Sequence, residues 1–381
     1  MHIVVAVDSF KGSLTSLQAG NAIRDAVISY NNGALVTVRP LADGGEGTVD
    51  ALCAGAGGTM ITIFVTGPRM ALVEAQYCIL EDGVTAVIEM ASAAGLPLLS
   101  EQERDPMETT TYGVGEIITD AISRGCRRFI VGIGGSATND GGTGMLSALG
   151  YNFLDAAGQP IQVGAKGLKH LASISTEKVI PELKECSFRI ACDVDNPLCG
   201  ERGCSAVYGP QKGATPENIE KMDRWLSGYA RIAAEVSADA DPAYPGSGAA
   251  GGLGFAFRTF LNAKLESGIS IVLEETKLEQ HIQAADLVIT GEGRLDAQTV
   301  MGKAPIGVAK LAKKYGKSVI AFAGCLGDGV ERCYQHGIDA FYAIDRGEMS
   351  LADAMIPENA YKNLSDTAVK VFRTMNLGGK C

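Results

Sequence analysis

The segment from Thr290 to Lys303 concentrates acids, bases and glycines within fourteen residues. Its charged side chains are two acids and two bases, namely Glu292, Asp296, Arg294 and Lys303. The apolar run Ala284–Ile289 comes directly before it and predicts a buried strand. Because α/β proteins bind ligands just beyond the carboxyl ends of their strands, the segment is predicted to be a ligand-binding glycine turn that leads into a helix.

Four more loops repeat this arrangement, each of them after an apolar run. They are Asp8–Ser13, Ala42–Thr48, Gly134–Gly142 and Asp193–Pro197. Glycine is abundant, with 48 of 381 residues against about 7% in an average protein. Five such loops in one chain indicate a shared purpose beyond turn formation.

Phosphoryl transfer is the chemistry that these side chains fit best, since it needs a divalent cation, positive groups on the phosphates and a positioned hydroxyl. One or two carboxylates commonly hold Mg²⁺ together with phosphates and waters. The loops offer carboxylates at Asp43, Glu46, Asp140, Asp193, Asp195, Glu292 and Asp296, and positive charges at Lys11, Lys212, Arg294 and Lys303. The backbone amides of 134–142 could form an anion-binding nest.

Each of these residues also has a simpler interpretation. An Asp beside Gly often makes only a turn, Ser136 and Thr138 could cap a helix, and Lys11 and Lys303 could be solvated surface charges. Asp193 and Asp195 fit this interpretation less well, because they end an apolar strand where a charge is costly.

Other catalytic and nucleotide-binding patterns are absent or incomplete. Gly302-Lys303 is followed by Ala304, so there is no P-loop, and the protein-kinase motifs are missing. The segment Gly132–Ala137 is a partial dinucleotide fingerprint, but the predicted helix starts later than this motif requires, which weighs against an NAD site. None of the four histidines lies in a glycine loop, so carboxylates and lysines must carry any catalysis.

The composition is that of an ordinary globular protein, with 46% hydrophobic and 20% charged residues. The net charge of −11 and the isoelectric point near 5.0 argue against nucleic acid or an anionic membrane as the main partner. No apolar run is long enough to span a bilayer, so a soluble, cytoplasmic protein is expected.

Strand and helix patterns alternate at both ends of the chain, which predicts an α/β fold with a doubly wound parallel sheet. The runs 59–65, 73–80 and 84–90 follow each other closely and predict an antiparallel meander. We therefore expect one domain from 1–63 and 281–381, interrupted by an α/β domain with a mixed sheet at 64–280, and an active site in the interdomain cleft. The segment 237–254 is expected to be a mobile loop or lid, or a plain surface loop.

Taken together, these segments resemble the bacterial glycerate kinase family (type 1). The matching segments, which span nearly the whole chain, are DSFKGSL (8–14), ADGGEGT (42–48), EMASAAGL (89–96), TTYGVGE (110–116), GGSATNDGGTG (134–144), CDVDNPLCGERGC (192–204), YGPQKGAT (208–215) and TGEGRLDAQTVMGKAPIGVAKLA (290–312). The resemblance implies a flavodoxin-like domain interrupted by a second α/β domain. It also implies ATP- and Mg²⁺-dependent phosphorylation of D-glycerate, giving 2-phosphoglycerate.

On this resemblance, roles are assigned to the loop residues as hypotheses. Asp193 or Asp195 would accept the proton of the glycerate hydroxyl, with Lys11 also catalytic. Substrate would be bound by Ser9, Lys11, Asp43, Arg294 and Asp296. The nucleotide would be bound by Gly134, Gly135, Ser136, Thr138, Asn139, Lys212 and Lys303, and Mg²⁺ by Asp43, Glu46 and Glu292.

Four alternatives to a D-glycerate 2-kinase stay open at this point, and one of them is an NAD dehydrogenase, which absorbance measurements with NADH would reveal. The enzyme could form 3-phosphoglycerate, because the regiochemistry depends on which hydroxyl faces the γ-phosphate. It could phosphorylate another small hydroxy acid. It could also be a nucleotide or metabolite sensor without turnover, although a sensor needs no proton acceptor at the end of the 188–192 strand.

Overall fold

The computed structural model describes residues 1–345, 347 and 349–375, and its chain divides into two compact units. The first unit consists of Met1–Asp43, Asp50–Gly57 and Ile269–Cys381, and the second of Gly44–Val49 and Gly58–Gly268. The predicted domains, 1–63 with 281–381 and 64–280, place both junctions later in the chain than the structure does. The prediction divides the chain after residues 63 and 280, and the structure divides it after Gly57 and Gly268. The strand that begins at Gly58 belongs to the sheet of the second unit.

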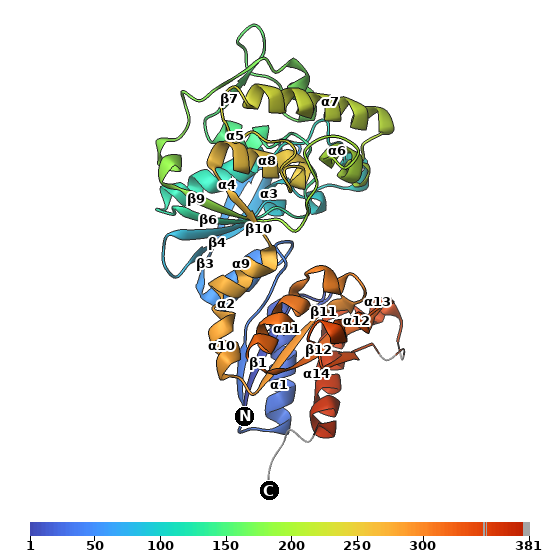
Figure 1. Ribbon diagram of the computed structural model, residues 1–381. Helices are drawn as coiled ribbons and strands as arrows, with labels where there is room; N and C mark the ends of the chain where they lie inside the picture. The colour runs from blue at the N-terminus through green and yellow to red at the C-terminus, as the bar shows by residue number, and fades with distance from the viewer. Residues whose placement is uncertain (346, 348, 376–381) are drawn as a thin grey trace. The chain divides into compact units, whose positions relative to one another are not determined.

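The first unit is built on a parallel sheet of five strands in the order β13-β12-β11-β1-β2 (Figure 1). The strands are β1 (His2–Val7), β2 (Leu35–Val38), β11 (Leu287–Leu295), β12 (Ser318–Leu326) and β13 (Ala340–Ala343). Counted along the chain, this is the 2-1-3-4-5 order of flavodoxin-like folds, so the predicted doubly wound sheet from both chain ends is confirmed. From β1 the chain continues to β2 on one side, and from β11 it continues to β12 and β13 on the other side. The strand order therefore reverses between β1 and β11, which makes this pair the topological switch point.

Helices cover the sheet of the first unit because its central strands are apolar on both sides. Alternate residues such as Ile3, Val5 and Ile289 form a core with α1 and α14, while Val4 and Val288, pointing the other way, are equally buried. The helices of this unit are α1 (Ser16–Tyr30), α9 (Gly268–Glu275), α10 (Leu278–Ala284), α11 (Ala304–Lys314), α12 (Arg332–Gln335), α13 (Leu351–Ala354), α14 (Pro357–Thr374) and the 3-10 turn η6 (Thr299–Met301), and α2 (Thr48–Ala56) straddles the division between the units.

The second unit is built on a mixed sheet of six strands in the order β10-β9-β6-β5-β4-β3. The strands are β3 (Gly58–Thr66), β4 (Leu72–Leu80), β5 (Thr85–Glu89), β6 (Arg128–Gly132), β9 (Ser187–Ala191) and β10 (Lys264–Glu266). Strands β3, β4 and β5 are antiparallel, which confirms the predicted meander, and β5, β6, β9 and β10 run parallel. A separate hairpin-like pair joins β7 (Asn152–Leu154) to β8 (Ser173–Ser175).

The core of the second unit is rich in aromatic side chains. The rings of Phe129 on β6 and Phe188 on β9 stack with centroids 4.8 Å apart, and Tyr229 packs edge-on against Phe255. The helices of this unit are α3 (Ala91–Ala94), α4 (Tyr112–Ser123), α5 (Thr143–Ala148), α6 (Cys204–Tyr208), α7 (Pro216–Ala233) and α8 (Ala249–Leu261). Its 3-10 turns are η1 (Leu96–Leu98), η2 (Glu101–Glu103), η3 (Ala165–His170), η4 (Pro181–Glu185) and η5 (Pro210–Lys212).

Two local predictions are wrong in ways that bear on function. The predicted glycine turn after Ile289 is largely strand, because β11 continues to Leu295. The predicted mobile loop at 237–254 is buried from Gly246 to Ala249 and from Gly251 to Gly254, and α8 begins within it. Three consecutive residues, Ala250 to Gly252, have left-handed backbone angles, so the first turn of this helix is sharply kinked. The helical periodicity of the sequence does not predict such a kink.

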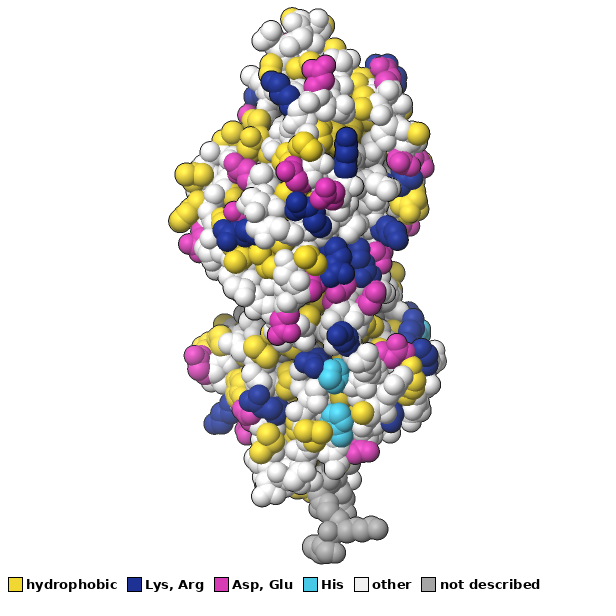
Figure 2. All heavy atoms as spheres, turned by 90° about the vertical axis from the view of Figure 1, so that its left-hand side faces the viewer, with side chains coloured by type: hydrophobic (Ala, Val, Ile, Leu, Met, Phe, Trp, Pro, Cys, Tyr) yellow, Lys and Arg dark blue, Asp and Glu magenta, His cyan; other side chains and the backbone are white. Residues whose placement is uncertain are grey.

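The surface carries both acidic and basic side chains, as the composition indicates. On the face seen in Figure 2, basic and acidic side chains are interspersed, and hydrophobic side chains lie in small groups between them. No helix among the described residues is long and apolar enough to cross a membrane.

Candidate functional site

Polar side chains of the first unit gather at the switch point of its sheet. β1 and β11 are parallel neighbours in which Val7 pairs with Gly291, so Asp8 and Glu292 follow at the same edge. Asp43 reaches this edge through the loop that follows β2, and Lys303 precedes α11. The fold therefore brings together charged residues that are almost 300 positions apart in the chain.

These residues line one cavity of about 330 Å³. One part of its wall is polar and includes Asp8, Ser9, Lys11, Ser13, Asp43, Glu292, Arg294 and Lys303. Another part is apolar and comes from Phe10 and from residues near the chain end, including Ile344, Leu351 and Met355. A cavity with one charged wall suits a small, strongly polar ligand.

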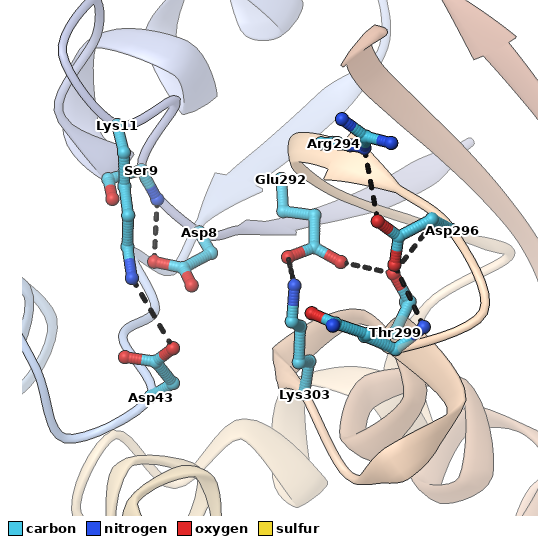
Figure 3. A network of polar contacts seen from close by, with 10 residues as sticks. Asp8, Ser9, Lys11, Asp43, Glu292, Arg294, Asp296, Thr299 and Lys303 are labelled. Carbon is cyan, nitrogen blue, oxygen red and sulfur yellow. Dashed lines mark hydrogen bonds and ion pairs between the residues drawn. The ribbon is translucent and has the colours of Figure 1, made fainter. Parts of the chain in front are cut away.

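Glu292 is the most constrained acid of the cavity. Its side chain is buried, and its Oε1 accepts a hydrogen bond of 2.7 Å from the hydroxyl of Thr299. Its Oε2 lies 3.4 Å from Nζ of Lys303 (Figure 3). Burial raises the pKa of Glu292, and the hydrogen bond from Thr299 and the charge of Lys303 oppose that rise. The geometry holds this carboxylate in one orientation.

Asp8 was not among the predicted site residues, although it lies in the same cavity. Only 5% of it is exposed, and its Oδ1 accepts a hydrogen bond of 2.6 Å from the Ser9 amide. Burial, followed by the negative charge of Asp43, raises the pKa of Asp8 to about 7, with a smaller contribution from Glu292. The signal that could have found it is its position directly after an apolar strand that pairs with the strand carrying Glu292.

Two ion pairs flank these acids. Lys11 Nζ lies 3.7 Å from Asp43 Oδ2, and Arg294 Nε lies 3.1 Å from Asp296 Oδ2. The side chains of Lys11 and Arg294 are 60% and 62% exposed, so both positive groups stay accessible to a ligand. Figure 3 shows Lys11 pointing toward Asp43, and Lys303 toward Glu292.

The carboxylates of the cavity fit a divalent cation. Burial destabilises Asp8 as an anion, the negative charges of Asp43 and Glu292 add to this, and a bound cation would offset their repulsion. Among the described residues, no group of three or more His, Cys, Asp or Glu side chains forms a ready-made metal site.

The predicted metal ligand Glu46 and both predicted proton acceptors belong to the second unit. Glu46 is exposed in the 44–49 segment. Asp193 and Asp195 are exposed after β9. Asp193 accepts a hydrogen bond of 3.2 Å from the Gly268 amide, and Asp195 pairs with Arg202 at 2.9 Å. The argument that their charge is costly at the end of an apolar strand is therefore wrong, because both carboxylates reach solvent; their role stays a prediction.

The predicted nucleotide loop is folded inward in the second unit. Thr138 and Asn139 are fully buried, and the amide of Asn139 donates to the hydroxyl of Ser205 at 2.8 Å. Gly134 and Gly135 are exposed, so their backbone stays accessible. Contact between this loop and a nucleotide stays a prediction.

Lys212 holds this loop from inside. It is 1% exposed, and its Nζ donates to Ser136 Oγ at 2.8 Å and to the Thr138 carbonyl at 2.7 Å. Burial lowers the pKa of Lys212 to about 8. In this arrangement Lys212 positions the loop and does not present a free charge to a ligand.

Comparison with known proteins identifies relatives along the full chain. The sequence model of the "Glycerate kinase family" matches residues 3–376. A "Glycerate kinase" of Bacillus subtilis strain 168 is 47% identical over 99% of this chain and 100% of its own length. A "Glycerate 2-kinase" of Escherichia coli K12 is 45% identical over 99% of both chains. A crystal structure from Salmonella typhimurium LT2 that carries the name glycerate kinase 2 superposes with a TM-score of 0.91 at 45% identity, covering 99% of this chain and 98% of that one.

Proposed function

Because this chain belongs to the glycerate kinase family, we propose that it transfers the γ-phosphoryl group of ATP to the 2-hydroxyl of D-glycerate, giving 2-phosphoglycerate and ADP. The full-length similarity to a bacterial glycerate 2-kinase supports the 2-position. The single observation that carries the chemistry is the cavity at the switch point, where Asp8, Asp43 and Glu292 face Lys11 and Lys303.

Lys11, Ser9 and Arg294 would hold the carboxylate of glycerate and the transferring phosphoryl group. Lys11 and Arg294 are exposed to the cavity, and each already pairs with an acid that an incoming anion could replace. Arginine suits this task because its planar group can donate two parallel hydrogen bonds to a carboxylate or phosphate. Asp296 would orient Arg294 through their ion pair.

Asp43 and Glu292 would hold Mg²⁺ directly or through water, with Glu46 as a further predicted ligand. When bound, Mg²⁺ neutralises the charge of the phosphate oxygens. Lys303 would then be released from Glu292 and could serve the nucleotide phosphates. In the second unit, the exposed backbone of Gly134 and Gly135 would bind nucleotide phosphates, with Ser136, Thr138, Asn139 and Lys212 maintaining the loop.

The proton of the glycerate hydroxyl needs an acceptor, and three carboxylates are candidates. Family resemblance supports Asp193 or Asp195, whereas the position of Asp8 in the cavity supports Asp8. The variants Asp8→Asn, Asp193→Asn and Asp195→Asn separate them. Loss of the acceptor should lower kcat by a factor of about 10² to 10⁴ with little change in the KM for ATP. A candidate whose variant keeps full kcat is excluded.

Substrate choice is tested by ADP release from purified protein, ATP and Mg²⁺ with a panel of small hydroxy acids. D-glycerate should give the highest kcat/KM, because the cavity presents Lys11 and Arg294 for one carboxylate, and acids that would hold Mg²⁺ beside one reacting hydroxyl. A higher kcat/KM with another hydroxy acid would overturn the substrate. No ADP release with any acid, despite ATP binding, would favour the sensor.

A further inference from the structure

A second hollow lies in the second unit and shares no residue with the cavity at the switch point. It has a volume of about 600 Å³ and is formed where η3 packs against α7. Its charged and aromatic lining residues are Lys166, Lys169 and His170 from η3, and Lys221, Arg224 and Trp225 from α7. None of them was predicted to take part in the reaction.

The hollow is basic in a chain whose net charge is −11. Two of its four Lys and Arg side chains are already neutralised: Lys166 pairs with Glu108, and Lys221 with Glu217. The side chains of Lys169 and Arg224 form no hydrogen bond or ion pair with another residue in the part of the chain that the structure describes. Two positive charges therefore stay uncompensated on facing elements.

The acids of α7 nearest to Arg224 are Glu220 and Asp223, and neither pairs with these two side chains; Glu220, four residues before Arg224, forms no ion pair within the described part of the chain. The carboxylate of Asp223, next to Arg224 on α7, turns to the Gly200 amide and accepts its hydrogen bond at 2.9 Å. His170 adds a ring N–H donor, and the partly buried Trp225 adds a flat apolar wall. Two cations, a further donor and an aromatic wall around one hollow match a dianionic group attached to an organic body.

We propose that this hollow binds the phosphate group of a small phosphorylated metabolite. A phosphate monoester carries nearly two negative charges at neutral pH, which equals the uncompensated charge of Lys169 and Arg224. Arg224 can donate two parallel hydrogen bonds to its oxygens, and Lys169 supplies a point charge. The remaining volume accommodates the organic part against Trp225. The phosphate could come from a sugar or acid phosphate, or from a nucleotide.

Trp225 makes the site directly measurable, because it is the single tryptophan of the chain. Its fluorescence is recorded while inorganic phosphate, 2-phosphoglycerate or ADP is added, each at an ionic strength held constant with sodium chloride. The same titrations are run on the double variant Lys169→Gln/Arg224→Gln. The control is Arg231→Gln, which removes another exposed arginine of α7 that pairs with Glu235 and does not line the hollow.

We expect a saturable fluorescence change with at least one phosphate compound. Its half-saturating concentration should rise at least about tenfold in the double variant and stay unchanged in Arg231→Gln. Among responses that the double variant loses, one to inorganic phosphate identifies the phosphate group alone as sufficient. A response to 2-phosphoglycerate but not to inorganic phosphate identifies an acid phosphate, and a response to ADP only identifies a nucleotide phosphate.

The proposal is overturned by the absence of a saturable change with all three compounds. It is also overturned if the response persists in the double variant while circular dichroism shows that the variant is folded, because the signal would then originate at another site. Turnover of the double variant should equal that of the unmodified protein, since neither Lys169 nor Arg224 lines the catalytic cavity.

Discussion

Replacing Asp8 with Asn should raise the free energy of unfolding while lowering the catalytic activity. Asp8 is almost fully buried, and its pKa of about 7 in the folded protein compares with 3.8 for an ordinary aspartate. The difference corresponds to a cost of about 4 kcal/mol for keeping this carboxylate charged in the folded state. Asparagine has the same shape and keeps an oxygen that can accept the Ser9 hydrogen bond.

The sign of the pH dependence follows from the raised pKa. Below about pH 4 Asp8 is protonated in both states and carries no cost. Between pH 4 and 7 the folded state retains a proton that the unfolded state has lost, so the contribution of Asp8 to stability falls as pH rises. Above pH 7 the full cost is present. We expect Asp8→Asn to gain about 2 to 4 kcal/mol at pH 8, after the smaller cost of burying an amide, and less than half of that at pH 5.

Urea unfolding of the metal-free protein at pH 5 and pH 8 measures this difference. Asp366→Asn is a suitable control because Asp366 is exposed on α14, and it should change stability little at either pH. Added Mg²⁺ should raise the melting temperature of the unmodified protein more than that of Asp8→Asn. Equal stability of Asp8→Asn and the unmodified protein at pH 8 would refute the view that clustered carboxylates are held there at a cost to stability.

Three further substitutions test the site. Gly291→Ala would place a Cβ 2.2 Å from the Phe322 carbonyl oxygen, so β11 must shift beside Glu292. We expect the free energy of unfolding, measured in urea, to fall by about 1 to 3 kcal/mol, and kcat to fall as well. The control Gly228→Ala, whose Cβ meets no atom within 4 Å, should be neutral or slightly stabilising. Glu292→Gln should lower kcat at least about 100-fold in the ADP-release assay. The control Glu279→Gln, which removes a surface carboxylate that pairs with Lys314, should not lower kcat. If Glu292→Gln and the unmodified protein have the same kcat, Glu292 takes no part in the reaction. Lys11→Met should raise the KM for glycerate about tenfold or more. The control Lys313→Met, which removes a lysine that pairs with Asp339 on the surface, should leave this KM unchanged. An unchanged KM in Lys11→Met would exclude Lys11 from substrate binding.

The sequence predicted the sheet of the first unit well, because strands such as β1 and β12 are apolar runs bounded by turn residues. It predicted β11 poorly at its end, where Gly291 and Gly293 suggested a turn. Those glycines are tolerated in a strand because neighbouring backbone comes too close for a side chain: a Cβ on Gly291 would lie 2.2 Å from the Phe322 carbonyl. Sequence patterns cannot show such close approach between strands.

The site was predicted in part for a similar reason. Lys11, Asp43, Glu292 and Lys303 were recognised from their glycine-flanked loops, and the structure places them in one cavity. Asp8 was missed, since its importance depends on the register between β1 and β11. Lys212 was predicted to be a nucleotide ligand from the family resemblance, which stays a prediction; the structure shows it buried, where it donates a hydrogen bond to Ser136. Residue type indicates the chemistry available, and only the fold determines which groups reach a ligand.

The most direct test of the proposed reaction couples purified protein, ATP, Mg²⁺ and D-glycerate to enolase without a phosphoglycerate mutase. Enolase acts on 2-phosphoglycerate, so formation of phosphoenolpyruvate at the rate of ADP release would establish transfer to the 2-hydroxyl. ADP release that depends on D-glycerate but yields no phosphoenolpyruvate would point to transfer to the 3-position, and would contradict the account.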